Sequence, residues 1–401
     1  MRVSTAQFYF QNSQQLTDKQ SGVNDQMKYL SSGKRVLTAK DDAVSYGTLA
    51  GYKDELMNID KYKRNITQAD NRNNLQETQL ANAESLLQNL KTLFIQANNG
   101  TLSDADLDAL AQLGEDSQRQ LLDIANSKDE TGGYIFAGYQ IDIQPFALQP
   151  DNSVNYLGDS GTREVQIAKN VMVATNQPGD LVFEKVENAI GDFSANYVTN
   201  TSGVSLTRAV IADPSNYDPA TNPPDYQFIF SAPNNLRVED GLGAVVYPTA
   251  PYTPGQTVAF NGIEVQFNGN PLPGDVVEIT PEQNISVFDT VKAAIDWMEV
   301  GTSPADPVQH EVDYQAILTQ LDSALNHITS RRTEAGIRLQ LSENQKNNHL
   351  DAELNLSSGR SNIEDLDFAK AIADFDQSKV ALQAAQQTFV QIKNLNLFNY
   401  I

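Results

Sequence analysis

The distribution of proline most constrains how this chain can fold. All 16 prolines lie between Pro145 and Pro307, and the flanking segments of 144 and 94 residues contain none. Proline disrupts a helix interior because it lacks an amide N–H and its ring clashes with the preceding turn. Two long proline-free flanks around a proline-dense centre therefore predict helices at both ends of the chain, with strands and turns between them.

The first flank carries apolar residues at seven-residue spacing. One row contains Tyr52, Ile59, Ile66, Leu80 and Leu87, with the polar Asn73 as its single interruption. Nearer the start of the chain, the same period links Tyr9, Leu16, Val23 and Leu30. A seven-residue repeat is typical of helices that pack along one another, so both rows predict helix.

The last flank has a more regular pattern, in which large and mostly small residues alternate in a 3-4 rhythm. This spacing is that of a coiled-coil seam, and its position at the end of the chain favours a seam made with a partner. An amphipathic helix that packs within its own domain is the alternative. The seam residues are Phe368, Ala371, Phe375, Leu382, Ala385, Phe389 and Ile392.

The centre of the chain alternates in the manner of strands at 154–156, 164–167, 226–230, 258–260 and 263–267. Asn261-Gly262 lies between two of these runs and predicts a hairpin turn. Pro178-Gly179-Asp180 and Pro273-Gly274-Asp275 are expected to be turns that lead into strands. The predicted fold is α+β: a long antiparallel helical bundle formed by both flanks, with a mostly antiparallel β domain inserted at 146–285.

Helix is expected to resume after Ser286, which with Asp289 resembles a capping box. The predicted domains are an N-terminal assembly helix (1–40), a helical domain in two pieces (41–145 and 286–356), the β domain (146–285) and a C-terminal coiled-coil helix (357–401). Charge differs between them: residues 1–40 include six basic and two acidic side chains, whereas residues 146–285 include five basic and sixteen acidic side chains.

Composition excludes several classes of function. The chain has no cysteine, which excludes disulfides, thiolate metal sites and a cysteine nucleophile. Its net charge of −23 makes nucleic acid and anionic membranes poor partners. No apolar run is long enough to span a bilayer. The first residues lack the apolar core of a cleaved secretory signal, so we expect a cytosolic protein or export by another route.

No set of residues indicates catalysis, a metal or a cofactor. Neither a phosphate-binding glycine loop nor a nucleophile elbow is present. The three histidines have no metal-binding spacing and are expected on helix surfaces. Acidic residues from Asp104 to Glu115 approach a calcium-loop pattern, but Ala109 stands where that loop requires glycine. We expect instead that Ser103 caps a helix. A glycosidase-like pair of carboxylates in the β domain stays open, because adjacent acids such as Glu239-Asp240 single out no pair.

Motifs in both flanks resemble those of the flagellin superfamily. They are residues 30–43 (LSSGKRVLTAKDDA), where a helix is expected to end at Ser-Ser-Gly, residues 99–104 (NGTLSD), and residues 361–369 (SNIEDLDFA). A second Ser-Ser-Gly at 357–359 suggests that both termini fold back at matching heights. Residues 132–139 (GGYIFAGY) and 144–146 (QPF), with 273–275 and 286–289, are similar to the hook-associated protein 3 family. The resemblance covers about 1–146 and 273–401.

The resemblance implies a structural, non-enzymatic subunit at the junction between flagellar hook and filament. It implies that both terminal segments are disordered in the monomer and form a coiled coil on assembly. It also implies export through the flagellar type III channel, an extracellular location, and partners: the hook-associated junction protein 1, flagellin, other copies of the chain, the export apparatus and an export chaperone. The alternatives are a flagellin subunit and a secreted protein that binds or cleaves glycans.

Overall fold

The computed structural model describes residues 5–219 and 224–394, with side chains for 7–219 and 224–391. The chain divides into two compact units. The first contains residues 1–64 and 344–401, and the second contains residues 65–343. Within each unit, helical segments from the two ends of the sequence pack together. The predicted fold class, an antiparallel helical bundle with an inserted antiparallel β domain, is confirmed.

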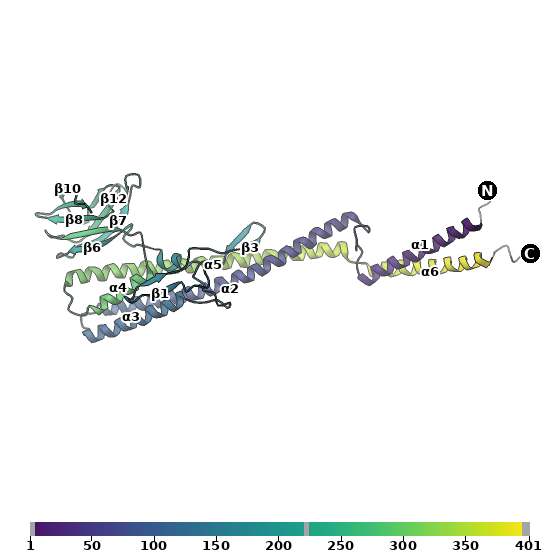
Figure 1. Ribbon diagram of the computed structural model, residues 1–401, viewed down its shortest axis with the longest axis horizontal. Coiled ribbons are helices and arrows are strands. Elements are labelled where there is room, and N and C mark those ends of the chain that lie inside the picture. The colour runs from purple at the N-terminus through teal and green to yellow at the C-terminus, as the bar shows by residue number, and fades with distance from the viewer. Residues whose placement is uncertain (1–4, 220–223, 395–401) are drawn as a thin grey trace, which may run out of the picture. The chain divides into compact units, whose positions relative to one another are not determined.

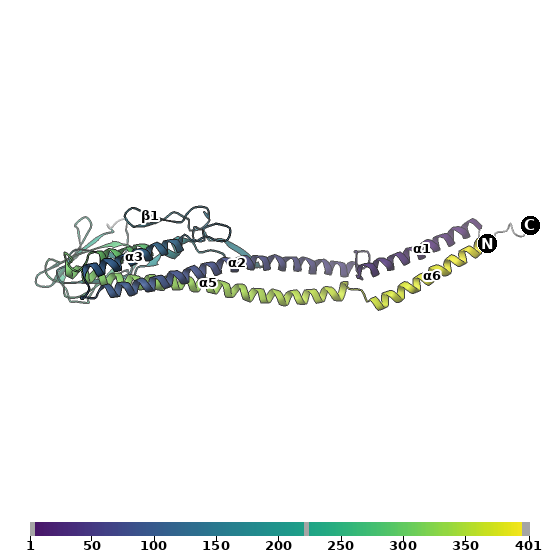
Figure 2. The ribbon, with the colours of Figure 1, turned by 90° about the horizontal axis from the view of Figure 1, so that it is seen from below.

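The first unit is entirely helical apart from its connections. It contains α1 (Thr5–Ser32), α6 (Phe368–Asn394), and portions of α2 (Ala43–Ala97) and α5 (Pro307–Glu364). α1 and α6 lie side by side in two perpendicular views (Figures 1 and 2). Tyr9 lies near the start of α1 and Phe389 near the end of α6. Their rings meet edge to face with centroids 5.3 Å apart.

The second unit has a helical body built from the remainder of α2 and α5 with α3 (Asp104–Ala125) and α4 (Val287–Glu299). Ser103 begins α3 with a capping box: its hydroxyl accepts from the amide of Asp106, whose carboxylate accepts from the amide of Ser103. That cap was predicted. Buried residues at the centre of the body include Leu80, Phe94 and Leu321, and they form one continuous apolar core.

Several short elements pack on this helical body. They are β1 (Phe146–Leu148) with β2 (Val154–Tyr156), β3 (Glu164–Ala168) with β4 (Val171–Ala174), the π-helical turn η1 (Asp180–Glu184), and β5 (Val186–Glu187) with β14 (Asn284–Ile285). Phe146, Val154 and Phe183 belong to the core of the helices. These three residues of the segment expected to begin the β domain are thus buried against the helices, outside the core of the sandwich.

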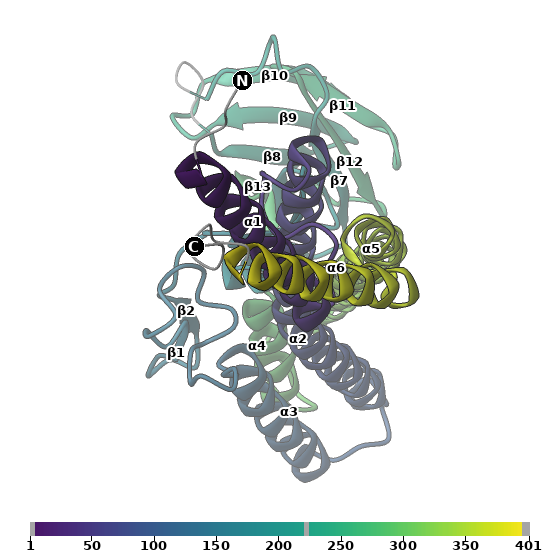
Figure 3. The ribbon, with the colours of Figure 1, turned by 90° about the vertical axis from the view of Figure 1, so that its right-hand side faces the viewer.

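The remaining strands form a β-sandwich with its own core. One sheet has the order β10 (Val245–Pro251), β9 (Asn235–Asp240), β8 (Tyr226–Ser231), β13 (Val276–Pro281) and β6 (Phe193–Thr199). The other has the order β11 (Thr257–Phe260), β12 (Ile263–Asn268) and β7 (Ser205–Ile211). All strand pairs of the sandwich are antiparallel, and the order β10, β9, β8 and β13 in the larger sheet can be followed in Figure 3. Phe228, Phe267 and other aromatic side chains fill the space between the sheets.

Two of the three predicted turns are confirmed. Asn261 and Gly262 have φ values of 46° and 77° and connect β11 to β12, as a two-residue hairpin of this sequence requires. Gly274 has a φ of 104° and precedes β13. The prediction for Pro178-Gly179-Asp180 was wrong, because the chain enters η1 rather than a strand. Val182 and Phe183 of that turn are fully buried, so their burial decides the local backbone.

Candidate functional site

The predicted seam on α6 lies on the less exposed side of that helix. Ala371 is buried, with 5% of its surface exposed. The side chains of Phe375, Leu382, Ala385 and Phe389 are partly buried. Phe368, in contrast, is 53% exposed. Ile392 belongs to α6, but its side chain lies outside the described residues.

On α1, the three predicted seam residues Leu16, Val23 and Leu30 are also partly buried, and α1 packs along α6. Every seam side chain described on these two helices, apart from Ala371 and Phe368, is thus only partly covered. Large apolar side chains that stay partly exposed on two paired helices form a surface that further helices can cover.

The same two helices expose further apolar side chains. Phe10 on α1 is 69% exposed, and Val380 and Val390 on α6 are 62% and 54% exposed. Phe8, Met27 and Ile372 are also exposed. Isolated exposed apolar residues are normal on protein surfaces, but this number on one helix pair marks an interaction surface.

A joint separates these helices from α2 and α5 of the same unit. α1 ends at Ser32, and Gly33 follows in the left-handed conformation with φ of +67°. The Gly33 amide donates to the carbonyl of Tyr29 (2.9 Å), which closes the last turn. A Cβ atom on Gly33 would lie 3.4 Å from Cζ of Phe368. The predicted helix end at Ser-Ser-Gly is therefore confirmed, and Phe368 packs beside it.

The two connections of the joint pair with each other through the backbone. The Arg35 amide donates to the carbonyl of Glu364 (2.7 Å), and the Leu366 amide donates to the carbonyl of Gly33 (3.0 Å). Lys34 and Asp365 form an isolated antiparallel β-bridge. The Arg35 side chain also donates to the carbonyl of Ile363 (3.0 Å). These hydrogen bonds thus hold the α1–α2 connection beside the α5–α6 connection.

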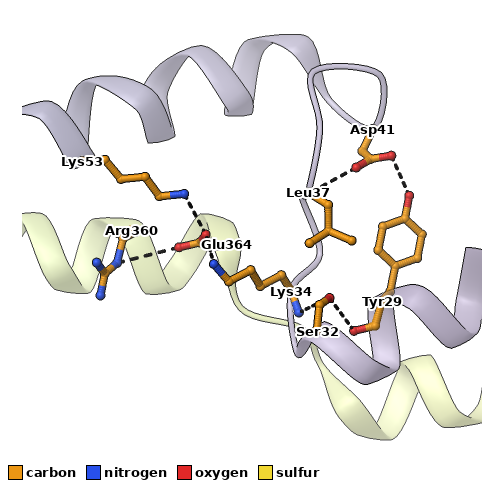
Figure 4. Close-up of polar contacts among 8 residues, drawn as sticks. All are labelled: Tyr29, Ser32, Lys34, Leu37, Asp41, Lys53, Arg360 and Glu364. Atoms are coloured by element: carbon orange, nitrogen blue, oxygen red, sulfur yellow. Dashed lines mark hydrogen bonds and ion pairs between the residues drawn. The ribbon is translucent and has the colours of Figure 1, made fainter.

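Glu364 is the electrostatic centre of the joint (Figure 4). Its Oε1 atom accepts from Nζ of Lys34 (2.7 Å) and from Nζ of Lys53 (2.9 Å). Arg360 lies 3.8 Å from Oε2. The Glu364 side chain is only 7% exposed, so these cations offset the cost of burying its charge. Burial acts to raise the pKa of Glu364, but the hydrogen bonds from Lys34 and Lys53 outweigh it and hold the pKa below its usual value.

Asp41 organises the longer of the two connections. Its carboxylate accepts from the amides of Leu37 (3.0 Å) and Thr38 (2.8 Å) and from the hydroxyl of Tyr29 (2.7 Å), as Figure 4 shows for Leu37 and Tyr29. The Tyr29 hydrogen bond is the main cause that lowers the pKa of Asp41 to about 2 and raises that of Tyr29 to about 12. Asp42 then caps α2 by accepting from the amide of Ser45 (3.0 Å).

The second Ser-Ser-Gly motif does not end a helix, contrary to the prediction. Residues 357–359 lie inside α5, which continues to Glu364. The chain turns instead at 365–367, where Asp367 accepts from the amide of Lys370 at the start of α6 (3.2 Å). Gly359 has a packing role: a Cβ atom there would lie 3.0 Å from Cε2 of Tyr52 on α2. Absence of a side chain thus permits close helix contact.

The role of Glu364 was missed from the sequence. It belongs to the motif at 361–369, but its partner Lys34 is 330 positions away and no local spacing connects them. The histidines were also misplaced. The ring of His310 stacks on Trp297 with centroids 4.1 Å apart, and that of His349 stacks on Tyr62 at 5.5 Å, so both take part in packing.

Neither a membrane-spanning helix nor a metal centre is found in the described residues. In 5–219 and 224–394, no helix is long and apolar enough to cross a bilayer. Within the same ranges, no group of three or more His, Asp or Glu side chains could hold a metal ion.

Comparison with protein families assigns this architecture to a class. Residues 3–141 match the family described as bacterial flagellin N-terminal helical region, and residues 318–401 match the bacterial flagellin C-terminal helical region. Together these matches cover more than half of the chain. The paired terminal helices and the inserted β domain thus define a flagellin-like protein.

Individual relatives narrow the class. The crystal structure of flagellar hook associated protein-3 from Legionella pneumophila is 30% identical, with a TM-score of 0.65 over 77% of this chain and 98% of that one. The flagellar junction protein FlgL from the same organism is also 30% identical, with a TM-score of 0.63 over 79% and 100%. Flagellar hook-associated protein 3 of Escherichia coli (strain K12) is 24% identical over 99% of both chains. The chain belongs to the hook-associated protein 3 family, as its motifs predicted.

Proposed function

We propose that this protein is a structural subunit of the bacterial flagellum that joins the hook to the filament. The observation that carries the proposal is the half-covered apolar seam on α1 and α6, where Phe375, Leu382 and Phe389 are only partly buried. Neighbouring subunits would complete this seam. The names of the relatives, which include a flagellar junction protein, support the place of the subunit in the flagellum.

Assembly and folding of the terminal helices are coupled in this proposal. An isolated helix is opposed by the cost of its nucleation and by chain entropy. Neighbours that cover the seam bury apolar surface, which stabilises the helices by roughly 1.5–3 kcal/mol for each large side chain. In this proposal the terminal segments, predicted as 1–40 and 357–401, are disordered in the isolated chain and become helical on assembly. The turn at 365–367 puts the start of the C-terminal assembly helix at Phe368 rather than at 357. The seam comprises Phe368, Ala371, Phe375, Leu382, Ala385, Phe389, Ile392, Leu16, Val23 and Leu30.

The partners follow from the position of a junction. One neighbour is the hook-associated junction protein 1, another is flagellin, and further copies of this chain complete a ring. Export through the flagellar type III apparatus, with the help of an export chaperone, would bring the chain outside the cell. Disorder of the terminal segments before assembly suits passage through a narrow channel. The proposal assigns no catalytic step, metal or cofactor to the chain, and no contact with nucleic acid or membrane.

A deletion of the gene tests the proposal. Cells without the protein should carry hooks but no filaments, and full-length flagellin should accumulate in the medium. Normal filaments in the deletion strain would show that the protein is not the junction. A flagellin subunit is the first alternative, because flagellins are also relatives of this chain. Self-polymerisation of the purified protein would favour that alternative. Glycan binding by the β domain, without any defect in filaments, would favour a secreted surface protein.

Substitution in the seam gives a sharper test. Phe375→Asp places a charge on the seam, and we expect a folded, exported protein that does not restore filaments to the deletion strain. Phe389→Asp should behave in the same way. Gln377→Asp is the control, since Gln377 is an exposed residue on the same helix that is not part of the seam. Filament growth with both seam variants would show that the seam is not the assembly surface.

A further inference from the structure

A groove with a volume of about 440 Å³ runs between β6 and the helices α4 and α5 of the second unit. Residues that line it include Ser194, Ala195 and Tyr197 from β6, Trp297 from α4, and Asp313 and Ile317 from α5. Ser194 and Ala195 are successive strand residues, so their side chains point to opposite faces of the sheet. Because both line the groove, it follows the outer edge of β6.

This edge of the sheet is available for pairing. β6 is the last strand of the five-stranded sheet, and β13 is its neighbour there. In the described part of the chain, no backbone hydrogen bond reaches the outer edge of β6 between Ser194 and Thr199. An edge strand of this kind presents a row of N–H and C=O groups to which an extended segment can add as a further strand.

The helical wall of the groove has an apolar surface with fixed side chains. Trp297 is 7% exposed, and its Nε1 atom donates to the carbonyl of His310 (2.8 Å). The ring of His310 stacks on the indole with centroids 4.1 Å apart. Ala316 and Ile317 extend this surface. Apolar side chains of an added strand would pack here.

Asp313 places a carboxylate within this apolar groove. It accepts from Nε2 of Gln309 (2.6 Å), and burial raises its pKa above the ordinary value. In the described residues it forms no ion pair with lysine or arginine, and the neighbouring carboxylate of Asp296 is paired with Lys292. The imidazole of His310 acts to lower the pKa of Asp313, but burial lowers the pKa of His310 itself and so disfavours its cationic form. A bound lysine or arginine would therefore still offset the cost of burying the Asp313 carboxylate.

The sandwich wall supplies no such cation. The sequence contains no lysine between Lys185 and Lys292. Both arginines of the sandwich are already paired. Nη1 of Arg208 lies 3.7 Å from Oε2 of Glu264, and Nη2 of Arg237 lies 2.7 Å from Oε1 of Glu239. The groove therefore combines an open strand edge, an apolar wall and one carboxylate that, in the described residues, has no lysine or arginine partner.

We propose that this groove binds an extended peptide segment of a partner protein, which adds to β6 and places a lysine or arginine beside Asp313. The cation complements the acidic groove, and apolar residues next to it contact the Trp297 side. This inference does not depend on the function proposed above. Failure of the junction proposal would leave the groove unchanged, and loss of peptide binding would leave the assembly seam unchanged.

The test is selection of a displayed library of random nonapeptides on the purified full chain. We expect enriched peptides to carry arginine or lysine between apolar residues. The best peptide should bind at least tenfold more weakly to Asp313→Asn, and also to Ala316→Trp, which fills the groove. Asp351→Asn, an exposed change elsewhere on α5, is the matched control and should bind as the wild type does. Hydrogen exchange of β6 amides should slow when the peptide is bound.

Three outcomes would overturn the proposal. One is a selection that enriches no sequence. Another is enrichment of peptides that lack a basic residue, or that bind the Asp313→Asn and Ala316→Trp chains as tightly as the wild type. The last is a concentration-dependent dimer of the isolated chain that Ala316→Trp abolishes, because the groove would then receive a second copy of the chain.

Discussion

Nζ of Lys34 lies 2.7 Å from Oε1 of Glu364, and this contact joins the connection after α1 to the last turn of α5. The two residues are 330 positions apart in sequence. Next to this ion pair, the Arg35 amide donates to the carbonyl of Glu364. The joint thus combines a backbone bridge with a mostly buried carboxylate shared by two lysines. Such a joint sets where α1 ends relative to where α6 begins.

Removal of the shared carboxylate should weaken the joint. Glu364→Gln keeps the shape of the side chain but leaves Lys34 and Lys53 without their counter-charge. A hydrogen bond to a charged group contributes about 1.5–3 kcal/mol, so we expect filaments that detach more readily under shear. Detached filaments can be counted by electron microscopy of the complemented deletion strain. Glu353→Gln, which removes the more exposed pair with Lys63, is the control. Equal detachment for both variants would contradict a special role of Glu364.

A disulfide can test whether the joint forms on assembly. The chain has no cysteine, so Lys34→Cys with Asp365→Cys introduces the only pair. These residues form an antiparallel bridge, a geometry in which opposed Cα atoms lie about 4.5–5.5 Å apart and a disulfide can close. We expect rapid cross-linking in assembled flagella and slow cross-linking in the isolated chain. Cross-linking that is equally fast in both, followed by gel mobility, would show that the joint precedes assembly.

Substitution by alanine should destabilise the end of α1 at Gly33 but stabilise the helix at Gly22. At Gly33, φ is +67°, and alanine would be strained there by about 1–2 kcal/mol. Gly22 lies within α1 with nothing within 4 Å of an added Cβ, so alanine should stabilise the helix by about 0.5–1 kcal/mol. We expect Gly33→Ala to reduce the fraction of cells with filaments and Gly22→Ala to maintain it. The reverse order would contradict the assignment of the helix end.

The stability of the second unit should depend on pH through Glu184. Burial is the main cause that raises its pKa from 4.5 to about 7, and the carboxylate of Asp289 adds to it. The native state therefore favours the protonated form. Its stabilising contribution is complete below about pH 4.5 and is lost as pH rises through about 7.

Glu184→Gln mimics the neutral form and tests this pH dependence. At pH 8 we expect its free energy of unfolding in urea to exceed that of the wild type by about 1–3 kcal/mol, and at pH 5 the difference should be much smaller. Glu299→Gln, a change at an exposed residue of α4, is the control and should show no such dependence. A difference for Glu184→Gln that is the same at both pH values would contradict the burial of an ionisable carboxyl at this position.

Local patterns in the sequence were sufficient to predict the elements and their class. Proline positions separate helical flanks from a strand-rich centre because the ring is incompatible with helix interiors. The hairpin at Asn261-Gly262 and the end of α1 at Gly33 depend on left-handed backbone that these residue types adopt readily. The heptad rows predicted an apolar face on each of α1 and α6, and the use of these faces as an assembly seam stays a prediction. All of these depend on residues close together in the chain.

Tertiary structure decided the features that depend on distant partners. Asn73 interrupts an apolar row because its fully buried amide donates to the carbonyl of Ala174 in β4, 101 positions away (3.0 Å). Gly359 continues a helix instead of ending it because Tyr52 packs against it. Lys34 and Glu364 pair because the fold brings together segments that are 330 positions apart in sequence. A helix end or a turn can be encoded by adjacent residues, whereas burial of a polar group and the pairing of two charges depend on which surfaces the fold brings together.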